Sequence, residues 1–245
     1  MKYAFCTNTG RRLRNEDSLY VPTPRDITQL VAVADGMGGH AAGIRASTLA
    51  VEGVSELLCR KHLGNNGEAE LRQAVQRVNL SIYRHAQAED GCRGMGTTLT
   101  AAILQPENYI VANVGDSRLY HFDGETIAQV TVDHSLVAVL VQSGAITMQE
   151  AAQHPQRNII TRALGTGAYE EVDLFLRSWA QGDILLLCSD GLHGSVSDFE
   201  MESALKQDVS LEERCNRLVQ LALNAGATDN VTVVLAQQDQ EVGRP

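Results

Sequence analysis

The segment ADGMGGHAAG occupies positions 34–43 and directly follows the apolar run QLVAVA at 29–34. Its acidic residue, Asp35, leads into a stretch with three glycines in the next four positions. A glycine-rich loop after a strand is typical of phosphate binding, because glycine lets another group approach the backbone. A carboxylate repels phosphate, however. The segment therefore predicts that a positive charge, such as a metal ion, stands between Asp35 and any phosphate.

The composition is that of an ordinary globular protein, with 245 residues, 44% hydrophobic and 20% charged. This length suits one large domain or two small ones. The net charge of −10 argues against general nucleic-acid binding, which requires a basic excess. No apolar run approaches the roughly 20 residues that span a bilayer, and the start MKYAFCTNTGRRLRNED does not resemble a signal peptide. We expect a cytoplasmic monomer that binds neither membranes nor nucleic acid.

The five cysteines are odd in number, widely spaced and without a CxxC motif. This pattern predicts reduced thiols in a cytosolic protein, not a disulfide framework or a zinc site.

Hydrophobic periodicity predicts the secondary structure. Strands are expected at 29–34, 97–104, 108–114, 118–122, 183–188 and 230–236. Amphipathic helices are expected after the glycine loop, with Ile44, Val51, Val54 and Leu58 on one face, and around 71–82 and 211–225. Several strands are apolar on both faces, and strands mostly follow strands. The pattern therefore favours two packed sheets flanked by helix layers over alternating βαβ units.

Acidic residues stand at the ends of these strands. Asp35, Asp116 and Asp190 each follow an apolar strand, and Asp229 directly precedes one. In an antiparallel sheet the end of one strand lies beside the start of its neighbour, so all four can gather on one rim. Converging carboxylates repel one another unless cations neutralise them, and oxygen ligands suit Mg²⁺ or Mn²⁺. Taken singly, each aspartate is equally compatible with capping a turn or a helix.

A resemblance to a known family rests on an ordered set of motifs. They are RRLRNED (11–17), ADGMGGH (34–40), MGTT (95–98), VGDSR (114–118), CSDGL (188–192) and TDNVTVV (228–234). In this order they resemble the bacterial branch of the metal-dependent serine/threonine protein phosphatases of type 2C. The likeness runs from about Thr7 to Leu235, and residues 133–165 resemble the flap of that branch.

The resemblance implies a fold and an activity. The fold is α+β, a four-layer α/β/β/α sandwich of two mainly antiparallel sheets flanked by helix pairs. It would form a single catalytic domain at 1–238, followed by a short tail at 239–245. The activity is hydrolysis of phosphoserine and phosphothreonine in proteins by a hydroxide that bridges two Mn²⁺ or Mg²⁺ ions. Phosphorylated proteins would be the substrates, and a cognate Ser/Thr kinase would act on the same system.

The same resemblance implies roles for residues of the rim. Asp35 matches the aspartate that bridges both ions, and the carbonyl of Gly36 matches a ligand of the second ion. Asp190 and Asp229 match ligands of the first ion. Asp116 matches a ligand of a third, weaker ion that it shares with Asp190.

The remaining implied roles concern water, phosphate and proton transfer. Glu16 and Asp17 match acids that bind or orient metal-bound waters. Arg12 matches the arginine that grips the substrate phosphate. His40 stands near the position of a proposed proton donor, although a lone histidine is more often structural.

One departure from the family pattern affects the arginine. The family places it three residues after a glycine, with Asn-Glu-Asp three further on, whereas the stretch from Gly10 to Asn15 is one residue short. Arg11 and Arg14 therefore stay alternatives to Arg12.

Three rival interpretations compete with the metal-dependent phosphatase. Cys6 and Arg12 have the CxxxxxR spacing of cysteine-based tyrosine phosphatases. An inactive phosphatase-like module that only binds phosphoproteins is the second alternative. A dinucleotide site at GMGG is disfavoured, because the spacing is not GxGxxG.

Overall fold

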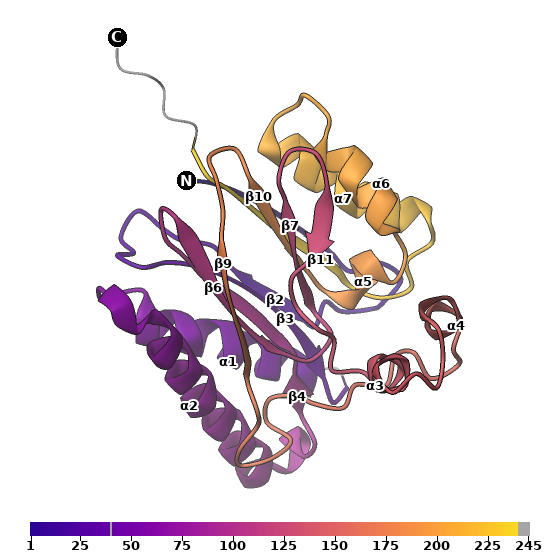
Figure 1. Ribbon diagram of the computed structural model, residues 1–245. Helices are drawn as coiled ribbons and strands as arrows, with labels where there is room; N and C mark the ends of the chain where they lie inside the picture. The colour runs from indigo at the N-terminus through magenta and orange to yellow at the C-terminus, as the bar shows by residue number, and fades with distance from the viewer. Residues whose placement is uncertain (40, 240–245) are drawn as a thin grey trace.

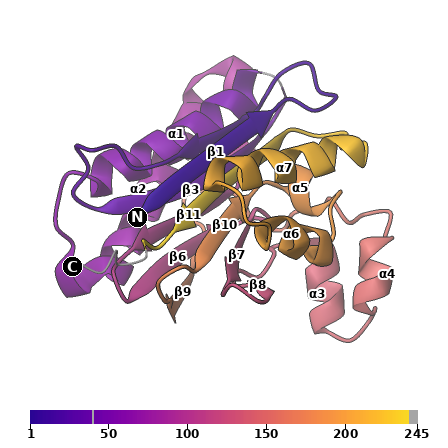
Figure 2. The same cartoon turned by 90° about the horizontal axis from the view of Figure 1, so that it is seen from above.

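The computed structural model describes residues 1–39 and 41–239, so His40 and the tail residues 240–245 lie outside the described part. Two β-sheets pack face to face, and helices cover the outer face of each sheet (Figures 1 and 2). All the strand pairs within these sheets are antiparallel. The architecture is the four-layer sandwich that the motifs imply.

The two sheets have different strand orders. The first sheet runs β2 (Asp17–Tyr20), β3 (Gln29–Met37), β5 (Leu99–Leu104), β6 (Asn108–Val114) and β9 (Asp173–Ser178), with β4 (Gly96–Thr97) paired to the end of β3. The second sheet runs β1 (Lys2–Asn8), β11 (Val231–Gln237), β10 (Ile184–Cys188), β7 (Arg118–Phe122) and β8 (Ile127–Gln129). The strands expected at 108–114 and 118–122 are found at those bounds, as β6 and β7.

β3 explains why an apolar run without polar alternation forms a strand here. Leu30, Ala32 and Ala34 pack against the helices that cover the first sheet. Val31 and Val33 face the second sheet. Both faces are therefore buried, as expected of a strand in the middle of a layered sandwich.

Gly36 lies within β3, because the strand continues past the apolar run to Met37 and pairs with β4. A Cβ atom on Gly36 would lie 2.1 Å from the carbonyl oxygen of Gly43 and 2.8 Å from that of Glu16. The sequence suggested that this glycine keeps a carbonyl accessible. The structure gives another reason, since three backbone segments meet here and leave no room for a side chain.

The layer between the two sheets is apolar. It consists of Val31, Val33, Ala102, Leu104, Tyr109, Val111, Leu119, Trp179, Leu185, Leu187, Val234 and Ala236. The rings of Tyr109 and Trp179 meet edge to face with centroids 5.8 Å apart. This close-packed layer holds the two sheets in one relative position.

Two groups of helices form the outer layers. The first sheet is covered by α1 (Ala41–Leu58) and α2 (Gly67–Ala88), with the short 3₁₀ turns η1 (Gly64–Asn66) and η2 (Asp90–Cys92) beside them. The second sheet is covered by α5 (Asp190–His193), α6 (Asp198–Leu205) and α7 (Leu211–Asn224). The three expected helices correspond to α1, α2 and α7. Ile44 is only half-buried, because Ala42, Ala46 and Ala50 supply the buried face of α1.

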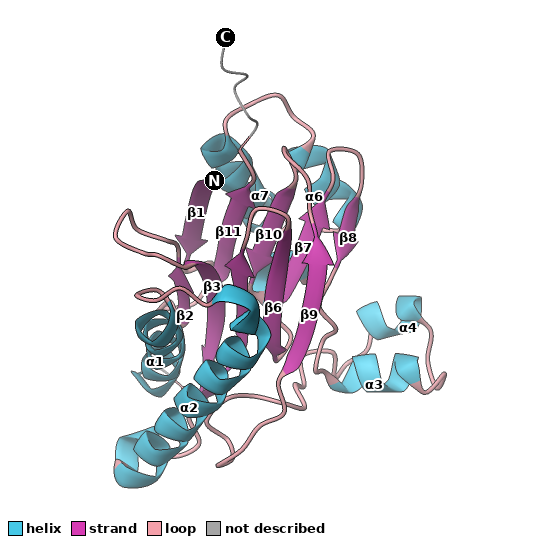
Figure 3. Cartoon of the chain, turned by 60° about the vertical axis from the view of Figure 1, so that its left-hand side comes forward, coloured by secondary structure: helices cyan, strands magenta, loops and turns pink. Residues whose placement is uncertain are grey.

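The flap, residues 133–165, projects from one end of the sandwich and contains α3 (Leu136–Gln142) and α4 (Met148–Ala152) (Figure 3). Within the described structure, neither helix contains a buried residue. The flap is anchored at its start by Arg118, which makes three hydrogen bonds of 2.7–3.1 Å to the carboxylate of Asp133. The two helices therefore add little to the core, whereas the flap has a fixed root and Leu164 near its end is fully buried in the core.

Two further observations concern the cysteines and the helices. All five cysteines are free thiols, in agreement with the expectation from their spacing. In the described part of the chain, none of the helices combines the length and the apolar character that crossing a membrane requires.

Replacing Leu187 by alanine is expected to lower the free energy of unfolding by about 3 kcal/mol, because its side chain is fully buried between the sheets. Leu176→Ala on the edge strand β9 is the control, since Leu176 is 51% exposed, and should cost about 0.5 kcal/mol or less. Urea unfolding of both variants measures the difference. Equal losses would contradict the placement of Leu187.

Candidate metal centre

Carboxylates from both sheets meet at one rim of the sandwich. In the first sheet, Asp35 of β3 lies opposite Asp17 of β2 in the antiparallel register. In the second sheet, Asp190 follows β10 and Asp229 precedes its antiparallel neighbour β11. The charges of Asp17, Asp190 and Asp229 all act on Asp35. The structure therefore brings these four side chains together.

The electrostatics of Asp17 reflect this crowding. Burial, together with the charges of Asp190 and Asp229, raises the pKa of Asp17 to about 7. Hydrogen bonds from Thr232 and Ser189 act in the opposite direction, because they stabilise the ionised form. Ser189 Oγ donates to Asp17 Oδ2 at 2.7 Å. Burial and repulsion outweigh these hydrogen bonds.

The other rim carboxylates behave similarly. Burial, followed by the charge of Asp17, raises the pKa of Asp35 well above its ordinary value. Burial and the charge of Asp229 raise the pKa of Asp190 to about 6. Burial and the charge of Asp190 raise the pKa of Asp116 to about 7. Near neutral pH the cluster therefore resists full ionisation unless positive charge is supplied.

The donors available at the rim fit a hard divalent cation. Within residues 1–39 and 41–239, the buried oxygens Asp17 Oδ1 and Asp190 Oδ1 have no hydrogen-bond partner. Such oxygens are costly unless a proton or a cation satisfies them. No three His, Cys, Asp or Glu side chains of this described part already form a closed metal-binding cluster. Closing the shell would therefore take small side-chain rotations, backbone carbonyls or water, the ligands that Mg²⁺ and Mn²⁺ commonly keep.

Glu16 lies beside Gly36 and the first turn of α1. The N–H of Gly36 donates to the carbonyl oxygen of Glu16 at 3.2 Å. A Cβ atom on Gly43 would lie only 1.9 Å from Oε2 of Glu16. The absence of side chains at both glycines therefore gives the Glu16 carboxylate its place next to the β3–α1 connection.

Of the three arginines in the N-terminal loop, Arg12 reaches the carboxylate rim. Its Nη2 donates to Asp229 Oδ2 at 2.7 Å, and its side chain is 59% exposed. Arg11 lies beside Gly226, where a Cβ atom would be 3.3 Å from its Nη2. Arg14 is exposed. The geometry therefore favours Arg12 among the three alternatives.

Asp116 lies in the loop between β6 and β7, and its backbone is held from beneath by a histidine. His193 Nε2 donates to the carbonyl oxygen of Asp116 at 3.0 Å. Burial lowers the pKa of His193 to about 3, so the ring is neutral and carries the donated proton on Nε2. No sequence motif singles out His193, which lies three residues past Asp190 and just outside the CSDGL motif.

Two other supporting residues also escaped the sequence analysis. Thr98 Oγ1 accepts a hydrogen bond from the backbone N–H of Asp35 at 2.8 Å, and Thr98 N–H donates back to the Asp35 carbonyl at 2.9 Å. Ser189 links two elements, since its Oγ accepts from Thr232 N–H at 3.0 Å while donating to Asp17. Thr98 belongs to the motif MGTT and Ser189 to the motif CSDGL. Their hydroxyl groups beside the acidic residues were the signal that could have marked them as hydrogen-bonding partners.

The cysteine-based alternative does not fit the structure. Cys6 lies in β1, paired with Val233, and packs against the core beneath α7. Burial raises the pKa of its thiol, whereas a nucleophilic cysteine needs a lowered pKa. The CxxxxxR spacing is therefore coincidental.

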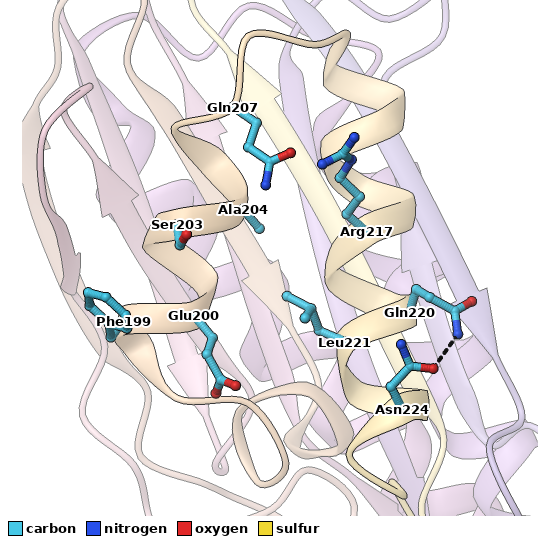
Figure 4. Close-up of a pocket in the computed structure, with 9 residues that line it drawn as sticks. All are labelled: Phe199, Glu200, Ser203, Ala204, Gln207, Arg217, Gln220, Leu221 and Asn224. Carbon is cyan, nitrogen blue, oxygen red and sulfur yellow. Dashed lines mark hydrogen bonds between the residues drawn. The ribbon is translucent and has the colours of Figure 1, made fainter.

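A hollow of about 300 Å³ lies elsewhere, on the outer face of the second helix layer (Figure 4). It is lined by Phe199, Glu200, Ser203, Ala204, Gln207, Arg217, Gln220, Leu221 and Asn224 of α6, α7 and the turn between them. None of the rim carboxylates lines it. The candidate centre is therefore an open rim and not this groove.

In the presence of a chelator, stability should fall as the pH rises from about 4 to about 7. The folded pKa of Asp17, about 7, exceeds the ordinary value of about 3.9. The folded state therefore binds the proton more tightly, and its contribution is present at low pH and lost as the pH passes about 7. Asp17→Asn should make this fall in stability smaller, as measured by thermal unfolding. Adding Mn²⁺ to the wild type at pH 8 should restore its stability.

The control for this measurement is Asp123→Asn. Asp123 lies in the β7–β8 turn, where backbone hydrogen bonds lower its pKa. This variant should not reduce the fall. An Asp17→Asn profile as steep as that of the wild type would contradict the electrostatic assignment.

Comparisons with known proteins agree with this geometry. A family model described as "Protein phosphatase 2C" matches residues 8–236. The chain is 42% identical over 247 residues to the serine/threonine phosphatase stp of Listeria welshimeri, covering 98% of this chain and 96% of the relative. It is also 42% identical over 237 residues to the serine/threonine protein phosphatase PstP of Mycobacterium tuberculosis, covering 96% of this chain and 45% of that protein.

Solved structures are similar over the same span. The Mycobacterium tuberculosis phosphatase PstP/Ppp superposes with a TM-score of 0.90 at 41% identity, covering 98% of this chain and 99% of that chain. The catalytic domain of PstP in complex with two manganese ions superposes with a TM-score of 0.87 at 38% identity, covering 98% of each chain. Sequence, fold and rim chemistry thus lead to one assignment: the chain belongs to the protein phosphatase 2C family.

Proposed function

We propose that the rim carboxylates hold the two divalent cations with which this chain hydrolyses phosphoserine and phosphothreonine in proteins. As a member of its family, the chain is a serine/threonine protein phosphatase that depends on Mn²⁺ or Mg²⁺. The observation that carries the residue assignment is the convergence of Asp35, Asp190 and Asp229, with Asp17, on one rim where their charges act on one another.

The proposed ligand set divides between the two sheets. Asp35 would serve both ions, the Gly36 carbonyl would be a ligand of the second ion, and Asp190 and Asp229 would be ligands of the first. Bound there, divalent cations lower the pKa of water and offset the charge of a phosphate group. The fold of this chain brings the carboxylates together, and two hydrogen bonds between Thr98 and the backbone of Asp35 hold Asp35 in place.

Arg12 is proposed to grip the phosphate of the substrate. A guanidinium group can donate two parallel hydrogen bonds to phosphate oxygens. Its exposed side chain and its contact with Asp229 support this role, because they place the group at the edge of the rim. Arg12 orients the phosphorus for in-line attack and balances the charge of the equatorial oxygens.

Three further acids complete the proposed site. Glu16 and Asp17 bind or orient water at the ions, and the unpartnered Oδ1 of Asp17 suits that role. Asp116 contributes to a third, weaker ion together with Asp190, whose charge acts on it. The role of His40 as proton donor stays a prediction, since His40 lies outside the described residues.

The proposed catalytic domain spans residues 1–238, with the flap at 133–165 and a tail at 239–245. Its substrates are phosphorylated proteins. We further propose a cytoplasmic, monomeric enzyme that opposes a cognate Ser/Thr kinase and binds neither nucleic acid nor membranes. The net charge of −10 supports the last point for polyanionic partners.

Asp35→Asn should lower turnover of a phosphothreonine peptide by about a hundredfold or more in saturating Mn²⁺, because the site loses its central electrostatic element. Cys6→Ser is the matched control and should stay within about threefold of wild type, since Cys6 packs half-buried against the core and burial raises the pKa of its thiol. Steady-state release of phosphate measures both variants. An inactive Cys6→Ser enzyme beside an active Asp35→Asn enzyme would overturn the assignment, as would full activity after exhaustive chelation.

Arg12→Ala should raise KM for the same peptide by about tenfold or more, since a bidentate charged contact exceeds the effect of an exposed neighbouring charge. Arg11→Ala and Arg14→Ala each should change KM by about threefold or less. Initial rates at varied peptide concentration separate KM from kcat. If Arg14→Ala gave the largest effect, the alignment across the shortened loop would be wrong.

A further inference from the structure

We propose that Asn230 is a positioning residue, whose side chain clasps the loop 9–16 and thereby places Arg12 and Glu16 at the rim. The inference rests on the proposed function, which gives these two residues their roles. Asn230 follows Asp229 directly and is only 4% exposed. It would not itself touch substrate in this scheme, because all its polar atoms face the loop.

The contacts of the Asn230 side chain are complete and specific. Its Nδ2 donates to the carbonyl oxygens of Thr9 at 3.0 Å and Arg14 at 2.9 Å. Its Oδ1 accepts from the backbone N–H of Glu16 at 2.8 Å. Flipping the amide would set its oxygen against two carbonyls and its NH₂ group against an N–H, so only one orientation satisfies the three contacts.

The same clasp fixes the turn that presents Arg12. The backbone N–H of Arg12 donates to the carbonyl oxygen of Thr9 at 3.1 Å. The carbonyl oxygen of Thr9 therefore accepts from both Arg12 and Asn230, and the start of the turn is held by the residue that directly precedes β11. Holding Arg14 and Glu16 as well immobilises the far end of the loop.

Close backbone packing strengthens the attachment. Gly10 has a φ of +57°, and a Cβ atom there would lie 2.1 Å from the carbonyl oxygen of Asp229. A Cβ atom on Gly191 would lie 1.9 Å from the carbonyl oxygen of Asn230. The Asp229–Asn230 segment is thus enclosed between the loop on one side and the first turn of α5, which carries Asp190, on the other.

This arrangement ties phosphate binding to the metal rim. Arg12 and Glu16 stand on this loop, and the carbonyl oxygen of Glu16 also accepts from the backbone N–H of Gly36 and from Ser47 Oγ. Removing the Asn230 amide leaves the carbonyls of Thr9 and Arg14 without their side-chain donor. The loop then loosens, and Arg12 samples positions away from the phosphate.

The first test needs no catalytic activity. Trypsin cleaves after arginine, and Arg11, Arg12 and Arg14 are exposed on the clasped loop. In Asn230→Ala, cleavage at these three sites should rise about fivefold or more over wild type, measured by mass spectrometry of the released peptides. Asn79→Ala is the matched control, since the Asn79 amide is also buried and also holds a loop segment through a backbone N–H, of Gly165, and a carbonyl, of Gly167.

The second test separates positioning from general destabilisation. Asn230→Ala should raise both KM for the phosphothreonine peptide and the inhibition constant of inorganic phosphate by about fivefold or more, whereas Asn79→Ala should leave both within about twofold. In an Arg12→Ala background the same Asn230→Ala change should alter the inhibition constant by less than about twofold. This coupling is expected only if Asn230 acts through Arg12.

The outcomes distinguish this inference from the proposed function. Faster loop cleavage together with the coupled loss of phosphate binding supports the clasp. If wild type is active with Mn²⁺ but Asn230→Ala matches Asn79→Ala in loop cleavage and in KM, the inference is overturned. If wild type with Mn²⁺ releases no phosphate while Asn230→Ala is still cleaved faster, the proposed function fails and the clasp remains supported.

Discussion

Mutual repulsion among carboxylates at one rim is the constraint on which the rest of the structure depends. Burial raises the cost of ionising Asp17, Asp35, Asp116 and Asp190, and the charges of neighbouring aspartates raise it further. A flexible chain would relieve that cost by moving the side chains apart. The sandwich prevents such relief, because each aspartate is held at or next to a strand end. A small multivalent cation at the rim would relieve this repulsion.

Two kinds of packing keep these aspartates from moving apart. Between the sheets, a layer of aliphatic and aromatic side chains fixes the strands, and so fixes the ends from which the acids project. At the rim itself, hydroxyl and amide groups hold the acidic segments directly. Thr98 binds the backbone of Asp35, Ser189 binds the carboxylate of Asp17, and Asn230 binds the loop that ends at Glu16. Apolar packing thus fixes the two sheets relative to one another, and hydrogen bonds at the rim fix the positions of the acidic segments.

Much of this could be predicted from the sequence, because central strands have strong apolar runs. β6 and β7 were predicted at their observed bounds, and the acids that follow or precede such runs could be placed on one rim from antiparallel geometry alone. The edge strands β2 and β9 were missed, since an edge strand is half-exposed and its pattern is weak. The close packing around Gly36 and the roles of Thr98 and His193 were missed for a different reason. Their contacts join segments distant in sequence, which only the folded chain brings together.

The position of β11 has a consequence for biosynthesis. β11 is the last strand of the chain, yet it lies between β1, the first strand, and β10. Until β11 has been synthesised, the second sheet therefore lacks the strand that joins β1 to β10. Asp229 and Asn230 emerge only just before that strand, so neither the rim nor the Arg12 loop can be complete earlier. A nascent or truncated chain that lacks β11 thus cannot complete the second sheet or bring Asp229 and Asn230 to the rim.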